Sequence, residues 1–486
     1  MYVVKSSGKL RNKSRYLLTT SILGIAVASA VSSKAEAATK PHYPAKTHSS
    51  SSRSTSQATL KPKRHHTVEG ADPESISVTV SRVRSHGSEI AVTRKVMDRF
   101  VEGTNPMQVL AMTTPGANFT STDAFGLDTY GNTFYVLGFT QMQIGATLDG
   151  IPLGTQGFAN NNGVSITQAM IQDDIGGMTM SQGAGALDSF SAQNLGGAMT
   201  YTSSDPKDKA GGKISQTFGS YNAYRTYGRV DSGILNPTGT KFYASFARTD
   251  TDLWKGAGGQ NELQADAKIV QPVGEHGKIT GFFGYGNFQQ MNYLTLTKNM
   301  WRQMGRDTTY LKPDYEKAKQ WAYYAQYTSD VPPGYEGKLS NDEIGDYAWD
   351  ASQVQRTYLS AVTGHFDLSE KIHSDTVAYG NVSSGLYGGT NNFVTSPSYG
   401  TPSLQADGSV TGVPMALGMS HADMRRLGFT QKFSYEAPHE NYIESGFWYE
   451  NNRWIYDSML YEDGLTTGHN PLSGFKKGTG STWYND

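Results

Sequence analysis

The chain of 486 residues contains no cysteine. This absence excludes disulfide bonds, thiolate metal ligands and cysteine nucleophiles, so packing and hydrogen bonds alone must hold the fold. An excess of either charge is also lacking, because 42 lysines and arginines face 43 aspartates and glutamates. This balance excludes a general polyanion binder, and we expect no nucleic acid among the partners.

Long apolar runs are scarce, and the longest is "LLTTSILGIAVASAV" at residues 17–31. It follows a basic start and precedes the small-residue stretch that ends at Ala37. About 15 residues fall short of the ~18–20 that span a bilayer, so a signal peptide over residues 1–37 is favoured over a membrane anchor. No later stretch reaches spanning length, and the mature chain is therefore either soluble or a β-barrel.

Residues 38–71 are polar and basic, with almost nothing to bury. This composition predicts a disordered linker, which we favour over a nucleic-acid-binding arm.

Sequence signatures of catalysis are missing as well. Gly183 and Gly185 fit the start of a dinucleotide fingerprint, but Asp188 stands where the third glycine belongs. The stretch "DTDLW" opens like a calcium loop, yet Trp254 and Lys255 occupy positions that need an oxygen ligand and a glycine. No phosphate loop, nucleophile elbow or paired-histidine zinc motif occurs, so we expect no enzyme, no cofactor and no metal site.

Glycine and tyrosine are abundant, with 54 and 29 residues, which favours β-structure with many turns. Within residues 72–206, Asn105 and Pro106 predict the start of a helix over residues 105–112. A second helix is expected from Thr93 to Phe100. Strands are expected at residues 133–139, 143–153 (with a turn at Asp149 and Gly150) and 176–183. These elements predict a mixed α/β domain.

After residue 206 the pattern changes to long alternating runs of about 9–13 residues. In "ELQADAKIV" at residues 262–270, the apolar residues face one way and Gln264, Asp266 and Lys268 face the other. We expect about nine strands, near residues 213–219, 223–233, 241–249, 262–270, 278–288, 354–366, 372–384, 425–435 and 442–453.

Two features favour a transmembrane barrel over a soluble sandwich, which would also alternate. The strands approach the ~9–11 residues that tilted spanning strands need. Tight connections also alternate with long ones, which cover about 249–261, 289–353 and 385–424, and this is the pattern of outer-membrane barrels. Residues 207–486 are therefore predicted to form antiparallel transmembrane β-strands.

The order of several segments resembles a known family. "NPMQVLAMTTPGANF", "VLGFTQMQIGATLDGIPLG" and "DDIGGMTMSQGAGALDSFSAQNLGGAMTYTSSDP" resemble the plug domain of TonB-dependent outer-membrane receptors. "GSYNAYRTYGRVDSGIL", at residues 219–235, is similar to the first barrel hairpin of that family. Residues 74–290 carry most of the likeness. Leu137 stands where the family commonly has an arginine, which puts in doubt a salt bridge between plug and wall from that position.

The resemblance implies a mixed α/β plug followed by an antiparallel transmembrane β-barrel in the outer membrane. It implies active import of a scarce nutrient, most commonly a ferric siderophore, with a passive channel or a surface-adhesion barrel as the alternative. In this interpretation the glycines of residues 145–163 shape the plug and hold no phosphate. The family binds its nutrient at the outer mouth and takes energy from the periplasmic protein TonB.

TonB captures a short segment before the plug by strand addition. Here that segment would comprise Glu74, Ser75, Ile76, Ser77 and Val78, with an ordinary first strand of the plug as the alternative. The connection 289–353 is rich in aromatic residues and would lie outside the cell. It offers Trp301, Trp321, Tyr323 and Tyr324 as ligand contacts, although packing among themselves is the favoured alternative.

Plugged transporters have 22 strands, whereas about nine are expected here. The sequence therefore predicts an incomplete barrel, of the kind that an interrupted gene would encode.

Overall fold

The computed structural model describes residues 89–157, 160–183, 189–439, 441–462 and 482–485. The predicted signal peptide (1–37), the linker (38–71) and the coupling segment from Glu74 to Val78 lie outside the described residues.

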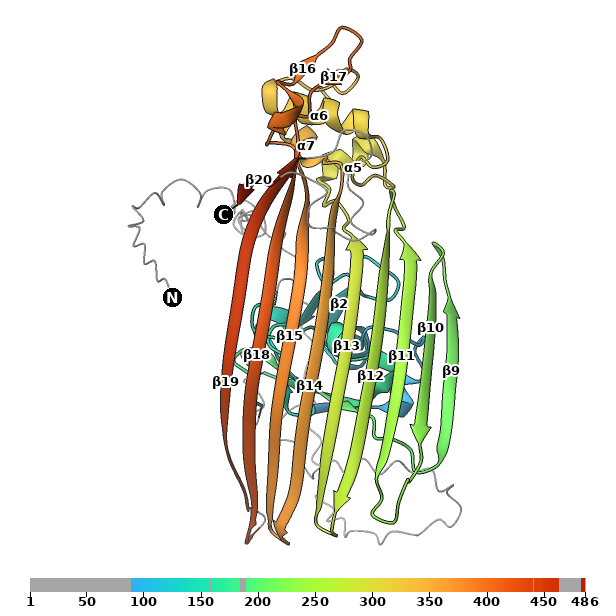
Figure 1. Ribbon diagram of the computed structural model, residues 1–486, viewed down its shortest axis with the longest axis vertical. Helices are drawn as coiled ribbons and strands as arrows, with labels where there is room; N and C mark the ends of the chain where they lie inside the picture. Colours follow the sequence, from blue (N-terminus) through green and yellow to red (C-terminus); the bar gives the residue numbers. More distant parts are fainter. Residues whose placement is uncertain (1–88, 158–159, 184–188, 440, 463–481, 486) are drawn as a thin grey trace, which may run out of the picture. The chain divides into compact units, whose positions relative to one another are not determined.

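The largest element is a ten-stranded antiparallel sheet with the order β20-β19-β18-β15-β14-β13-β12-β11-β10-β9 (Figure 1). Its strands, here called the large sheet, are β9 (Ala210–Phe218), β10 (Tyr224–Ser232), β11 (Lys241–Asp252), β12 (Gly259–Val273), β13 (Gly277–Met291), β14 (Ala351–Ser369), β15 (Ile372–Asn391), β18 (Ala416–Ala437), β19 (Asn441–Glu462) and β20 (Thr482–Asn485). The expected large antiparallel sheet is confirmed, and each expected strand segment overlaps one of these strands.

The large sheet exposes apolar side chains on one face and covers polar side chains on the other. On β12, Leu263 and Ile269 are exposed, whereas Gln264, Asp266 and Lys268 are buried. The alternation expected for residues 262–270 is confirmed, and its sense is the reverse of that in a soluble protein, where the covered face is apolar.

Several strands are much longer than the expected 9–13 residues. β14 and β15 have 19 and 20 residues, and β18 and β19 have 22 each. The regular alternation fades in the glycine-rich stretch 385–391, yet backbone pairing continues from Ile372 opposite Tyr435 to Asn391 opposite Ala416. Hydrogen bonds between neighbouring strands therefore extend the sheet beyond the segment that the side-chain pattern marks.

Residues 89–206, here called the small domain, form two small sheets and short helices. One sheet has the order β1-β7-β8-β5-β6 and the other the order β2-β3-β4. The elements are β1 (Glu89–Thr93), α2 (Arg94–Met97), α3 (Pro106–Thr113), β2 (Ala117–Thr120), β3 (Thr133–Val136), β4 (Phe139–Thr140), η2 (Gln141–Gln143), β5 (Gly145–Leu148), β6 (Ile151–Pro152), α4 (Ile166–Ala169), η3 (Gln172–Asp174), β7 (Ile175–Gln182) and β8 (Gly197–Ser203).

Local signals placed several of these elements correctly. The Asn105 side chain accepts a hydrogen bond from the Met107 amide at 2.8 Å, so it caps α3 as predicted. Asp149 and Gly150 have φ values of 49° and 81°, which is the turn expected between β5 and β6.

Two expectations for the small domain were wrong. The helix expected from Thr93 to Phe100 is only the four residues of α2, because Thr93 belongs to β1 and pairs with Gly177. The strand expected over residues 133–139 is divided in two, because the chain turns at Leu137, where φ is 50°. At Thr93 a pairing with distant backbone overrode the local pattern, and at Leu137 a tight turn between adjacent strands did so.

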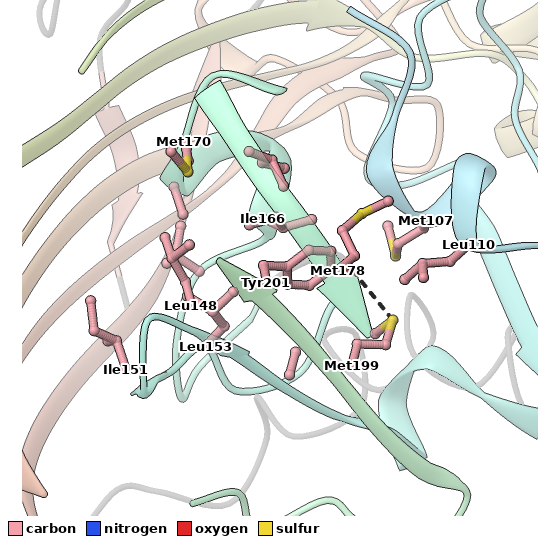
Figure 2. Packing of buried hydrophobic residues seen from close by; sticks show 14 of the residues in the cluster. Met107, Leu110, Leu148, Ile151, Leu153, Ile166, Met170, Met178, Met199 and Tyr201 are labelled. Carbon is pink, nitrogen blue, oxygen red and sulfur yellow. Dashed lines mark hydrogen bonds between the residues drawn. The ribbon is translucent and has the colours of Figure 1, made fainter. Parts of the chain in front are cut away.

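The core of the small domain is continuous with the large sheet. Figure 2 shows Met107, Leu110, Met178, Met199 and Tyr201 packed together, with the Tyr201 hydroxyl donating to the Met199 sulfur at 3.4 Å. The same cluster includes buried residues of the large sheet, namely Phe282, Leu359, Ala361, Val377 and Tyr379. The small domain therefore packs on the covered face of the large sheet.

The connection expected over residues 289–353 contains α5 (Lys298–Met304), α6 (Tyr315–Tyr327) and α7 (Asn341–Asp346), which lie at one end of the large sheet (Figure 1). With η4 (Pro397–Tyr399), β16 (Ser403–Leu404) and β17 (Val410–Thr411), they form the helical lobe, residues 292–350 and 392–415. The lobe has its own apolar core, centred on Trp321. No described helix has the length and apolarity needed to cross a bilayer.

Candidate functional site

Two consecutive aspartates fix the small domain to the large sheet. Asp173 and Asp174 lie in η3, and both side chains are buried. The Arg225 guanidinium lies 2.5 Å from the Asp173 carboxylate, and that of Arg229 lies 2.8 Å from the Asp174 carboxylate. Both arginines come from β10, so one strand pairs with both acids.

Asp174 collects further donors from the large sheet. The hydroxyls of Tyr227 and Ser245 donate to its two carboxylate oxygens at 2.7 and 2.6 Å. Arg229 also pairs with Asp231 at 2.8 Å. Removal of one member would leave other buried charges without a partner, and such a loss is costly because water cannot replace it freely.

The polar side chains of β12 form hydrogen bonds with buried polar groups of the small domain, most of them backbone groups. Asp266 accepts a hydrogen bond from the Ile171 amide at 2.8 Å, and Gln264 donates to the Thr167 carbonyl at 2.6 Å. Lys268 donates to the Ser203 hydroxyl at 2.8 Å. The buried polar face of the sheet thus satisfies the backbone of short strands and turns that cannot satisfy themselves.

A second contact explains the glycine- and asparagine-rich stretch. Arg426 of β18 donates to the carbonyl oxygens of Pro152, at 2.6 Å, and Asn162. A Cβ at Gly163 would lie 1.9 Å from the Leu153 carbonyl oxygen, so only glycine fits there. Gly154 has a φ of 68°, which also favours glycine. These residues shape the chain around an arginine, in line with the structural role expected for the glycines.

Leu137 makes no such contact. Its side chain is 59% exposed, and among the described residues no ion pair joins its turn to the large sheet. The ion pairs between the small domain and the large sheet that are buried on both sides start instead from η3, whereas Glu102 and Asp205 make partly exposed pairs with Lys213 and Lys268.

A cleft of about 340 Å³ lies between the small domain and the connections that follow β11 and β13. Its lining residues are Thr122, Asp128, Tyr130, Gly131, Trp254, Lys255, Tyr293, Leu294 and Thr295. Residues from three separate segments therefore meet around one space.

The small-domain side of the cleft is held rigidly by Asp128. One carboxylate oxygen accepts from the Tyr130 amide at 3.0 Å and from Gln290 of the large sheet at 2.5 Å. The other accepts from the Thr122 hydroxyl at 2.7 Å. Next to it, Asp123 accepts three backbone amide hydrogen bonds, and burial raises the pKa of its carboxyl group.

The opposite side of the cleft is aromatic and carries one cation. The rings of Trp254 and Tyr293 lie 6.0 Å apart between centroids, and the Trp254 amide donates to the Tyr293 hydroxyl at 3.0 Å. The Lys255 ammonium lies 5.4 and 5.7 Å from the two ring centroids. Burial lowers the pKa of Lys255, because the half-buried ammonium loses part of its hydration.

The ligand contacts predicted from the sequence lie elsewhere. Trp321 is buried in the core of the helical lobe, edge-on to Tyr335 and Tyr347 at 4.9 and 5.0 Å between centroids. Trp301 is exposed on α5, while Tyr323 and Tyr324 are half-buried on α6. None of these four lines the cleft described above, and Trp321 has the packing role that was the favoured alternative.

Sequence reasoning missed both the anchors and the cleft. Trp254 and Lys255 attracted notice only as a failed calcium loop. The one local signal was a lysine directly after a tryptophan, shortly after the end of a strand. No residue near Lys255 in the sequence indicates that Asp128 lies across the cleft from it.

No protein-family model matches the chain, and no curated protein matches it. Solved structures do share its fold. The ferric citrate transporter FecA in its unliganded form aligns with a TM-score of 0.54 at 13% identity, over 82% of this chain and 51% of that one. The ferripyoverdine receptor of the outer membrane of Pseudomonas aeruginosa, bound to ferripyoverdine, aligns with a TM-score of 0.52 at 13% identity, over 82% and 47%.

The ferric-catecholate import receptor Fiu from K12 E. coli, in its closed form, aligns with a TM-score of 0.50 at 12% identity, over 79% of this chain and 48% of that one. The chain therefore spans about half the length of these structures. The resemblance to TonB-dependent outer-membrane receptors is confirmed at the level of the fold.

Proposed function

We propose, from this shared fold, that the chain is an outer-membrane receptor for TonB-coupled import of a scarce nutrient. Residues 72–206 would be the plug and residues 207–486 part of the barrel wall. The observation that supports this best is the reversed polarity of the large sheet, with Leu263 and Ile269 exposed and Asp266 and Lys268 buried. Lipid on one face and a wet interior on the other produce that pattern in outer-membrane barrels.

The anchors of the small domain fit a plug. Asp173, Asp174 and the arginines of β10 hold it to the wall through charged hydrogen bonds, besides its apolar contacts. Charged contacts can be exchanged for contacts with water once the interface opens, so a domain held in this way can be moved by an external force. A passive channel or an adhesion barrel would gain nothing from such a domain.

Energy coupling is proposed for the segment Glu74, Ser75, Ile76, Ser77 and Val78, through strand addition to TonB. Ile76→Pro removes a backbone donor that a pairing strand needs. We expect this variant to lose transport and to keep binding of ligand at the cell surface. Ser56→Pro, in the predicted linker, serves as the control and should leave both unchanged. Equal loss of transport and binding would place the coupling segment elsewhere.

The proposed cargo is a ferric siderophore or a related iron complex, by analogy with the solved structures of the same fold. Cells with and without the gene would be supplied with ferric citrate, a ferric hydroxamate and a ferric catecholate, each labelled with radioactive iron. We expect gene-dependent uptake of one of them that stops when a protonophore dissipates the proton gradient. Gene-dependent uptake that persists without the gradient would indicate the passive channel.

A further inference from the structure

Lys255 places a positive charge in the cleft without an anionic group of the described residues paired to it. Its ammonium is half-buried between two aromatic rings, and within the part of the chain that the structure describes it donates only a long 3.5 Å hydrogen bond, to the Leu294 carbonyl. Among the ion pairs of the described residues, none includes Lys255. A partly desolvated ammonium gains free energy when an anion reaches it.

Asp128, the acidic residue of the cleft, forms no ion pair with Lys255 in the described structure, and its carboxylate is not free to bind a cationic ligand. Both carboxylate oxygens of Asp128 already accept hydrogen bonds, from Thr122, Tyr130 and Gln290. A ligand amine would therefore compete with three existing donors. A neutral sugar could stack on the rings but would leave the ammonium unpaired.

We infer that this cleft binds a small planar anion, with its negative group on Lys255 and its ring against Trp254 and Tyr293. The inference rests on the proposed function, because it names the class of ligand at the ligand-binding end of that receptor. A volume of about 340 Å³ lies at the lower end of the ~300–1,000 Å³ usual for small-molecule sites. The ligand is accordingly a compact aromatic acid or its chelate, rather than a long peptide siderophore.

The test uses the full chain in detergent, with 2-naphthoate as the probe and the neutral 2-naphthamide as its isostere. Equilibrium dialysis measures both affinities, with protein-free micelles as the blank. The variants are Lys255→Met, which keeps the apolar stem, and Lys255→Arg, which keeps the charge. Lys317→Met is the matched control, because Lys317 lies over the Trp321 ring at 5.1 Å but belongs to the helical lobe.

We expect the wild-type chain to bind 2-naphthoate at least tenfold more tightly than 2-naphthamide. Lys255→Met should lose this preference while it binds the amide as before, which also shows that the site has folded. Lys255→Arg should restore the preference, and Lys317→Met should leave it unchanged. Equal affinities for the two probes, no binding of either, or a preference that survives Lys255→Met would overturn the inference.

Together, equilibrium dialysis and cellular uptake show whether the ligand class or the proposed receptor function is wrong when an experiment fails. If the probes fail while iron uptake depends on the gene and on the proton gradient, the receptor function stands and the small-anion class is wrong. If 2-naphthoate binds through Lys255 but no iron complex depends on the gene, the ligand class stands and iron import is wrong.

Discussion

The small domain and the helical lobe are both joined to the large sheet, but different forces hold them. The small domain combines an apolar core with buried ion pairs and charged hydrogen bonds to the sheet. The lobe encloses a core of its own, in which Trp321 is surrounded by aromatic and aliphatic side chains. Apolar cores resist separation in proportion to buried area, whereas the polar part of the contact between the small domain and the sheet can reopen by exchanging partners with water. The comparison predicts a lobe that stays folded while the small domain moves.

The largest effect is expected from Trp321→Ala. Loss of a fully buried tryptophan typically costs about 3–5 kcal/mol, because it leaves a cavity in a close-packed core. Limited proteolysis should then cut residues 292–350, and the small domain should stay protected. Trp301→Ala is the control, since its side chain is 51% exposed and the change should cost little. Protease resistance equal to that of the wild-type chain would contradict an independent lobe core.

The next effect concerns the ionic anchor. Asp174→Ala leaves Arg229, Tyr227 and Ser245 without their shared acceptor, and we expect a cost of about 3 kcal/mol. Hydrogen exchange of backbone amides in residues 166–182 should accelerate, while exchange in the helical lobe stays unchanged.

Asp208→Ala provides the comparison for that variant, because Asp208 pairs with Lys241 at 2.7 Å at an exposed position. Exposed pairs contribute only about 0–1 kcal/mol, so amide exchange should hardly change. Similar changes in amide exchange for Asp174→Ala and Asp208→Ala would show that burial of the ion pair adds nothing to the stability of the small domain.

A smaller effect is expected from Arg426→Met. The change leaves two carbonyl groups of the small domain without a donor, at a cost of about 1–3 kcal/mol. Amide exchange should accelerate in residues 152–163 and not in η3. Arg425→Met, on the exposed face of the same strand, should have no such effect. Faster exchange throughout the small domain would mean that its two anchors act as one unit.

The smallest effect lies where the two regions meet, at the cleft. Affinity for 2-naphthoate should fall as the pH rises through the pKa of Lys255, because only the ammonium form pairs with a carboxylate. Burial lowers this pKa, so the loss should begin below the ordinary lysine value of about 10.4. The other titratable groups around the cleft are Asp128, Tyr130 and Tyr293, and burial raises the pKa of Tyr293 to about 12. Lys255→Arg should retain its affinity in this range, and a matching loss in that variant would assign the effect to another group.

Local chemistry made much of this fold predictable. The cap at Asn105, the turn at Asp149 and Gly150 and the alternation along β12 all depend on neighbours in sequence, so the sequence reveals them. The helices of the lobe were missed, although Ser340 and Glu343 form a capping box that the sequence displays. Short helices inside a long connection have too little periodicity to stand out.

The candidate site depended on contacts between residues far apart in the chain. Asp173 and Arg225 are 52 positions apart, and Asp128 and Gln290 are 162 apart. A single sequence contains no signal for such pairs. The abundance of aromatic residues in the connection 289–353 led to the prediction that Trp321 contacts the ligand. That abundance does not distinguish a binding surface from a core, and Trp321 lies in a core.

The unusual length of β18 has a consequence for where a ligand is first met. Its 22 residues extend about 70 Å at ~3.3 Å per residue, whereas a bilayer core is ~30 Å thick. The exposed apolar residues Leu427, Phe433 and Tyr435 all lie in its second half, and the half nearer the helical lobe carries His421 and Asp423. In the proposed function the apolar half lies in lipid, so the polar half extends beyond the headgroups. The distance is greater than the ~8 Å over which salt screens the charge of the membrane surface. An anion approaching the lobe is therefore beyond the repulsion of acidic lipids, and the composition of the membrane surface should not alter its rate of capture.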